Sequence, residues 1–189
     1  MFNQIDGISS HHLGARTMKR VCNLNDDTLT LVDRRQFREN DIVLYSFGEI
    51  DVRFHIQNQI RPNVDALQLI DTLTTQYIER LSIHGMTFVK HVRLGVVGIV
   101  PPGRIDDINK RWKSKWGSVA GSDEERLSYV RSMNDCLRRL CAQRDMIFLD
   151  VYDVTHDVDG MMDQRLTVDH VHITDSEPIK QLLITNRLI

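Results

Sequence analysis

The stretch DIVLYSFG at residues 41–48 is a short apolar run, rich in residues that favour β-structure, and it ends at a glycine. Such a run predicts a strand that is buried on both faces of a sheet. Two similar runs follow: HVRLGVVGIV at residues 91–100, which two prolines terminate, and MIFLD at residues 146–150. The sequence therefore predicts three buried strands.

The segments between these strands carry helical periodicity. Apolar residues recur at three- and four-residue steps over residues 64–83, which predicts an amphipathic helix. Ser122-Asp-Glu-Glu125 has the spacing of a capping box and predicts the start of a second helix, and Asp175-Ser176 are expected to start a last one. Strands separated by helices indicate βαβ units. We therefore expect a parallel sheet covered by helices on both faces, a three-layer α/β/α fold.

Composition limits the kind of protein this can be. The 189 residues carry 24 Lys+Arg and 26 Asp+Glu, a net charge of 24 − 26 = −2, and 41% of them are hydrophobic. These values predict one globular domain over residues 1–189. They disfavour a dedicated nucleic-acid binder, which needs a basic face. There is no apolar run of the ~20 residues that a membrane helix requires, and MFNQIDG is unlike a secretory signal. We expect a soluble, cytoplasmic protein.

Sequence motifs for metals and cofactors are missing. The three cysteines form no CxxC pair, so they predict neither a disulfide framework nor a structural zinc site. There is no glycine-rich phosphate loop of the GxGxxG or P-loop type. We expect no cofactor and no resident metal.

Four polar residues follow the first predicted strand: Glu49, Asp51, Arg53 and His55. Ligands of open α/β sheets bind beyond the carboxyl ends of the strands, so this segment is a candidate binding region. The alternative is a solvated turn that holds a weak ion pair. Counting alternate positions after the strand, we expect Glu49 and Asp51 to share a face.

A second candidate cluster is Thr167-Val-Asp169-His170-Val171-His172, ahead of the last predicted helix. Asp169 and His172 are three residues apart, so one turn can place the carboxylate on an imidazole nitrogen and make the ring a general base. Two alternatives stay open, an ordinary hydrogen-bonded loop and a metal site. The metal site would use Asp169, His170 and His172, helped by His156, Asp157 and Asp159. We expect both polar clusters to line one cleft.

An aromatic and basic segment separates the second strand from the capped helix. Its residues suit either a lid that binds sugars or anions or a long surface loop with an amphipathic turn. They are Lys110, Arg111, Trp112, Lys113, Lys115 and Trp116.

Residues 41–51 resemble the third sequence block of the SGNH (GDSL-like) hydrolase superfamily, an apolar strand that runs into Gly-x-Asn-Asp, and residues 168–174 resemble its last block, Asp-x-x-His. More narrowly, FGEIDVRFHI at 47–56 looks like a branch found in carbohydrate and cell-surface polysaccharide contexts. The resemblance extends from about residue 8 to residue 189. It implies a flavodoxin-like sheet, His172 as general base, Asp169 orienting it, and backbone donors for an oxyanion at Gly14 and Gly48.

Two departures from that superfamily matter. Ile50 replaces the asparagine whose amide helps to hold the oxyanion. Arg53, His55 or backbone N–H groups would have to donate the hydrogen bonds to the oxyanion instead. The Gly-Asp-Ser block, with its nucleophile and the central first strand of the order 2-1-3-4-5, is absent. Either the start was set at an internal methionine, or the chain is a degenerate member, or it does different chemistry.

The leading hypothesis is a carbohydrate-modifying esterase or acyltransferase that is inactive if no nucleophile is present. Its partner would be a carbohydrate or an acylated sugar, with no nucleic acid and no membrane span. One alternative is a non-catalytic carbohydrate-binding or assembly module, in which Trp112 and Trp116 contact the sugar. Another is a different sugar-tailoring enzyme, such as a methyltransferase.

Overall fold

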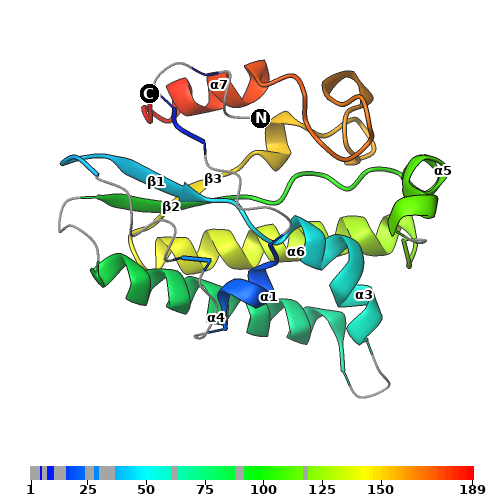
Figure 1. Ribbon diagram of the computed structural model, residues 1–189, viewed down its shortest axis with the longest axis horizontal. Coiled ribbons are helices and arrows are strands. Elements are labelled where there is room, and N and C mark those ends of the chain that lie inside the picture. Colours follow the sequence, from blue (N-terminus) through cyan, green and yellow to red (C-terminus); the bar gives the residue numbers. More distant parts are fainter. Residues whose placement is uncertain are drawn as a thin grey trace.

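The computed structural model describes residues 5, 8–10, 16–23, 28–29, 37–60, 64–87, 92–116 and 119–189, without the side chains of residues 86, 87, 115 and 116. The described elements alternate between strands and helices along the chain (Figure 1). No helix among these residues is both long enough and apolar enough to cross a membrane.

A three-stranded parallel sheet lies at the centre of the fold. Strands β1 (Ile42–Tyr45), β2 (Arg93–Val97) and β3 (Ile147–Leu149) are hydrogen-bonded in the order β1-β2-β3. All three predicted strands are confirmed in place, although each is shorter than its apolar run. An all-parallel arrangement follows because each strand is joined to the next through helices, as βαβ units require. The absence of the central first strand of the flavodoxin-like order stays a prediction.

Helices cover both faces of this sheet (Figure 1). Helices α4 (Ala66–Thr87) and α6 (Asp123–Ala142) pack on one face, and α7 (Glu177–Thr185) lies on the other. Neighbouring residues of β2 show the alternation: Val96 belongs to the α4–α6 core and Val97 to the α7 core. The predicted three-layer α/β/α fold is confirmed.

The capping box of α6 is present as predicted. Ser122 accepts a hydrogen bond from the Glu125 amide at 3.2 Å, and Glu125 Oε2 accepts one from the Ser122 amide at 2.7 Å. These two bonds satisfy donors at the helix start that have no intrahelical partner. They fix where α6 begins, which matters because its first turns hold part of the candidate site.

The segment after β1 is helical and not the turn that we predicted. Residues 49–50 start a helix that continues through the π-helical η2 (Asp51–His55) into α3 (Ile56–Gln59). Buried Val52 and Ile56 are four residues apart, which is the helical spacing that could have revealed it. In a helix, residues two apart lie about 200° apart around the axis. The expectation that Glu49 and Asp51 share a face was therefore wrong.

The remaining elements are short or lie at the rim of the sheet. The aromatic and basic segment forms helix α5 (Ile105–Trp116), where we had weighed a loop against a lid. A short helix α1 (Met18–Val21) precedes β1 in the chain. The 3₁₀ turns η3 (Tyr152–Val154) and η4 (Gln164–Leu166) lie between β3 and α7.

Candidate active site

Asp169 and His172 form a hydrogen-bonded pair in the loop before α7. Asp169 Oδ2 lies 2.6 Å from His172 Nδ1, while Asp169 Oδ1 accepts the backbone N–H groups of Val171 at 3.0 Å and of His172 at 2.7 Å. The Asp169 side chain is 13% exposed and that of His172 is 61% exposed. The predicted contact is therefore present, with the carboxylate sheltered and the ring open to solvent.

Local backbone structure produces this pairing. Residues Thr167 and Ile173 form an antiparallel bridge that closes the loop, and His170 at its tip has a positive φ of 65°. The turn aims two amides at the carboxylate of Asp169, which is the local bonding that Asp favours in turns. Spacing and turn chemistry thus suffice to bring Asp169 onto His172.

The surroundings of Asp169 keep it ionised. Burial would raise its pKa, but the hydrogen bonds from the His172 ring and from the backbone amides of His172 and Val171 outweigh burial and lower the pKa to about 2. An ionised Asp169 can fix the tautomer of His172 and stabilise the ring when it is protonated. Nε2 is then the ring nitrogen that exchanges a proton with a reacting group.

The two predicted clusters do approach each other, through Arg53. Its side chain is 10% exposed and forms an ion pair with Glu49, one turn earlier in the same helix. The charge of Asp169 acts on Arg53, and Phe54 packs against the apolar cluster that contains Val171. Arg53 is therefore close enough to the loop for its charge to interact with that of Asp169.

The other members of the first cluster have different roles. Asp51 is fully buried, and its Oδ2 accepts the amide of Met18 at the start of α1, at 2.6 Å. Its side chain holds α1, so we correct the expectation that Asp51 lines the cleft. His55 acts electrostatically on Asp51 and belongs to the same side of the helix. Of the four residues, Arg53 is the one on which the charge of Asp169 acts, and Glu49 is paired with Arg53.

Gly48 acts by allowing close packing. Its φ is +111°, and a Cβ at this position would lie 2.7 Å from Ile99 Cδ1 and 2.8 Å from Met18 Cε. Only glycine can both adopt this backbone conformation and fit into the space available. The expected oxyanion donor Gly14 and the side chain of Trp116 lie outside the described residues.

Trp112 contacts the loop that carries Asp169 and His172. Its indole N–H donates to the backbone carbonyl of Asp169 at 3.1 Å, and its ring packs with Ile108, Val119 and Val171. Part of the indole is thus used for internal packing, and the sugar contact that we considered for Trp112 stays a prediction. Lys110, Arg111 and Lys113 are exposed along the same helix.

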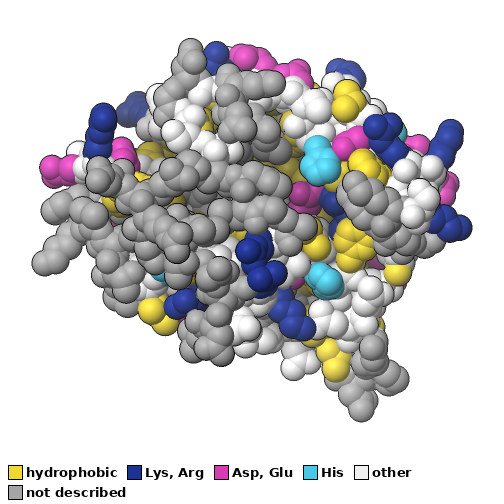
Figure 2. Space-filling model, in the orientation of Figure 1, with side chains coloured by type: hydrophobic (Ala, Val, Ile, Leu, Met, Phe, Trp, Pro, Cys, Tyr) yellow, Lys and Arg dark blue, Asp and Glu magenta, His cyan; other side chains and the backbone are white. Residues whose placement is uncertain are grey.

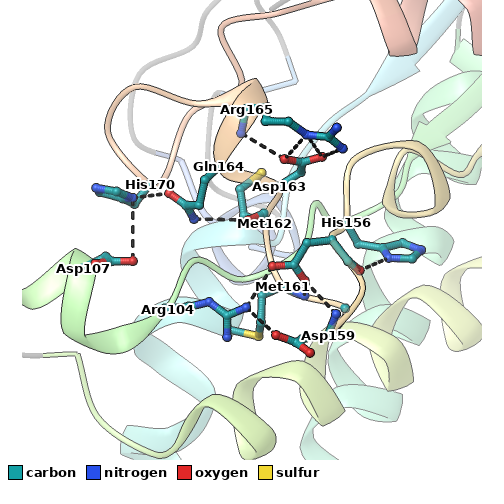
Figure 3. A network of polar contacts seen from close by, with 12 residues as sticks. Arg104, Asp107, His156, Asp159, Met161, Met162, Asp163, Gln164, Arg165 and His170 are labelled. Atoms are coloured by element: carbon teal, nitrogen blue, oxygen red, sulfur yellow. Dashed lines mark hydrogen bonds and ion pairs between the residues drawn. The ribbon is translucent and has the colours of Figure 1, made fainter.

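Polar contacts tie the loop to α5 (Figure 3). Arg104, just before α5, bridges Asp157 and Asp159, while the His170 ring contacts Gln164 and lies 3.9 Å from Asp107 on α5. The candidate metal ligands thus have separate partners: Asp157 and Asp159 bind Arg104, His170 contacts Gln164, and Asp169 contacts His172. No group of three His, Cys, Asp or Glu among the described residues is placed to hold a metal ion.

Sequence reasoning missed three residues of α6 that position the site. Asn134 bonds both backbone groups of Ile99, just after β2, at 2.7 and 2.9 Å. Arg126 donates to the carbonyl of Gly103 at 2.7 Å, and Asp123 Oδ1 accepts the amide of Ile105 at 2.9 Å. The available signal was a polar residue on the buried stripe of a predicted helix, as Asn134 and Arg126 both are.

Comparisons with known proteins give a likeness of fold. No family model matches this chain, and no curated protein sequence does. Among solved structures, a chain from Streptococcus pneumonia described as a candidate platelet activating factor is similar to it, with a TM-score of 0.60 and 13% sequence identity. The match covers 85% of this chain but only 66% of the other, just under two thirds of its length. This likeness supports the three-layer α/β/α fold.

Proposed function

We propose that this chain is a carbohydrate-modifying esterase or acyltransferase of SGNH-like type, with His172 as the general base. The observation that carries the proposal is the 2.6 Å contact between Asp169 Oδ2 and His172 Nδ1, which leaves the second ring nitrogen on an exposed imidazole. A base that is oriented by a buried carboxylate is the arrangement that acyl transfer requires. The carbohydrate part rests on the resemblance of residues 47–56.

In this reaction His172 Nε2 removes the proton from an attacking hydroxyl group or water as it adds to the ester carbonyl. The imidazolium ion that forms is stabilised by ionised Asp169, and it then gives its proton to the leaving alcohol. Asp169 itself stays unprotonated, because its hydrogen bonds keep its pKa near 2. We assign the base and its orienting carboxylate to this chain, and no nucleophile.

The test is hydrolysis of p-nitrophenyl acetate and a panel of acetylated sugars. The samples are the chain itself and the chain extended by the residues that its genome encodes in frame before Met1. We expect His172→Ala to lower kcat/KM by at least about a hundredfold, the lower end of what general bases contribute. Asp169→Asn is expected to lower kcat/KM at least about tenfold, since it no longer holds the correct tautomer.

His156→Ala is the matched control, because His156 is an exposed histidine whose ring bonds only to a neighbouring backbone carbonyl, at 2.6 Å, among the contacts described. Its activity should equal that of the wild type. The proposal fails if neither sample hydrolyses any ester, or if His172→Ala leaves the rate unchanged. Equal losses in His156→Ala and His172→Ala would show that the loss is not specific to His172, and would also contradict the proposal.

Sugar binding without hydrolysis, unaffected by His172→Ala, would favour the non-catalytic module. Because Trp112 supports the Asp169 carbonyl, a Trp112 variant cannot separate the two functions, whereas His172→Ala can.

A further inference from the structure

Two buried arginines, Arg53 and Arg126, line one small cavity beside the 169–172 loop. Their side chains are 10% and 2% exposed, and Glu49, Pro101 and Pro102 also line the cavity. Its free volume is about 10 Å³, close to what one water molecule needs. Arginines are seldom buried this deeply unless their charge is compensated.

The hydrogen bonds of Arg126 are incomplete. Nη1 donates to the Gly103 carbonyl at 2.7 Å, and the nearest carboxylate oxygen, on Asp123, is 3.9 Å from Nη1, beyond hydrogen-bonding distance. Nε is buried, and no residue that the structure describes accepts a hydrogen bond from it. A buried guanidinium N–H group without an acceptor is unfavourable, and a bound ligand would supply one.

The residues that line the cavity carry more positive than negative charge. Two guanidinium groups and one carboxylate line it, a sum of 2 − 1 = +1, while Asp123, 3.9 Å from Arg126, and Asp169 add negative charge outside the lining. Burial and the positive charge of Arg126 together lower the pKa of Arg53 to about 10, against a smaller opposing effect from Asp169. The two arginines therefore repel each other, and a bound anion would relieve that repulsion.

The cavity is adjacent to the candidate base. Gly103, whose carbonyl binds Arg126, packs directly against the backbone carbonyl of His170, so closely that a Cβ at residue 103 would not fit. Arg53 is close enough to Asp169 for their charges to interact. The cavity therefore lies next to the loop that carries Asp169 and His172.

We propose that Arg53 and Arg126 form a subsite for the carboxylate of an acidic sugar, next to Asp169 and His172. This inference rests on the proposed function and specifies its substrate class. A cavity with room for about one water molecule suits a single carboxylate oxygen better than the larger tetrahedral phosphate or sulfate group. Hydrogen bonds from guanidinium N–H groups to a carboxylate oxygen are charge-assisted and strong, so two arginines suit such a ligand.

The surface near the site fits the same ligand. Lys110, Arg111 and Lys113 are exposed on α5, and Figure 2 shows basic side chains gathered at that end of the molecule. Such a patch attracts anionic molecules from solution and raises their rate of association.

The experiment compares binding of methyl glucuronide and methyl glucoside by isothermal calorimetry at low ionic strength. The two sugars differ in one carboxylate. We expect the wild type to bind the glucuronide at least about tenfold more tightly, as one charge-assisted hydrogen bond provides. Arg126→Gln should reduce that preference to less than about twofold. Arg139→Gln is the control, since Arg139 is exposed on the same helix and pairs with Asp71.

Glu49→Gln provides a second test of the subsite in case Arg126→Gln fails to fold. It removes the carboxylate that pairs with Arg53, so affinity for the glucuronide should rise severalfold while affinity for the glucoside stays constant. The inference is overturned by equal affinity for the two sugars, by a folded Arg126→Gln that keeps the preference, or by weaker glucuronide binding in Glu49→Gln. Tighter binding of glucose 6-phosphate than of the glucuronide would overturn the assignment to a carboxylate.

The failure of this inference can be distinguished from the failure of the proposed function. The glucuronide preference is expected to survive His172→Ala, because the binding arginines and the base are separate residues. Loss of hydrolysis in His172→Ala without any sugar preference in the wild type would uphold the esterase and reject the subsite. A preference for the glucuronide without any hydrolysis would uphold the subsite and reject the esterase.

Discussion

The indole of Trp112 donates its N–H group to the backbone carbonyl of Asp169 across 3.1 Å, and so joins α5 to the loop that carries the Asp169–His172 pair. The two residues are far apart in the sequence, yet this bond fixes the backbone at the residue that orients His172. Helix α5 therefore supports the candidate active site from one side, while α6 supports it through Arg126 and Asn134.

Replacing Trp112 with phenylalanine tests this support. Trp112→Phe keeps most of the ring packing but removes the N–H group, so we expect a loss of about 1 kcal/mol in the free energy of unfolding. Urea denaturation followed by circular dichroism measures it. Lys113→Gln, on the exposed side of the same helix, should leave the stability unchanged. Equal stabilities for wild type and Trp112→Phe would show that the bond contributes nothing.

The pH dependence of stability reports on Asp169. Its hydrogen bonds lower the folded-state pKa from the ordinary 3.8 to about 2, so the ionised form stabilises the fold above the ordinary pKa. That contribution disappears as the pH falls through this interval. We expect Asp169→Asn to lose less stability than the wild type between those two pH values. Parallel stability curves, measured by urea denaturation at a series of pH values, would contradict this assignment.

Asp51 is expected to matter for stability through α1. Asp51→Ala removes the acceptor of the Met18 amide, which should lower the free energy of unfolding by about 1–3 kcal/mol. Asp51→Asn keeps one acceptor oxygen and avoids burying a charge, and burial is the main cause of the raised pKa of Asp51. It should therefore be less damaging than Asp51→Ala. Equal losses in both variants would mean that the charge itself is required.

A comparison of Gly48 and Gly121, which both have a positive φ, distinguishes the cost of backbone strain from the cost of a steric clash. Gly48→Ala pays for a left-handed backbone and also clashes with Ile99 and Met18, so we expect a loss of about 2–4 kcal/mol. Gly121 has a φ of +86°, but its nearest neighbours are the side chains of exposed Glu125 and half-buried Gln57, which can move aside, whereas Ile99 and Met18 are buried. Gly121→Ala should cost only about 1–2 kcal/mol. A smaller loss for Gly48→Ala than for Gly121→Ala, measured by thermal denaturation, would contradict the packing argument.

Much of the fold could be predicted because its signals are local. The apolar runs at 41–48, 91–100 and 146–150 correspond to β1, β2 and β3, and the capping box at Ser122 marks the start of α6. Periodicity and capping depend on residues within one or two turns, so they can be recognised in the sequence alone. The segment after β1 was misassigned because its four polar residues alternate with apolar ones, as in a strand. The helical signal was the four-residue spacing of Val52 and Ile56.

The sequence by itself determined the order of strands and helices, the parallel sheet, and the pairing of Asp169 with His172, because a single turn spans those two residues. Only the tertiary structure decided that Asp51 holds α1, that Trp112 supports Asp169, and that Arg53 and Arg126 meet at one cavity. These contacts join residues that are distant in the chain. They depend on how the helices pack against the sheet, and hydrophobic burial, which drives that packing, has no fixed direction.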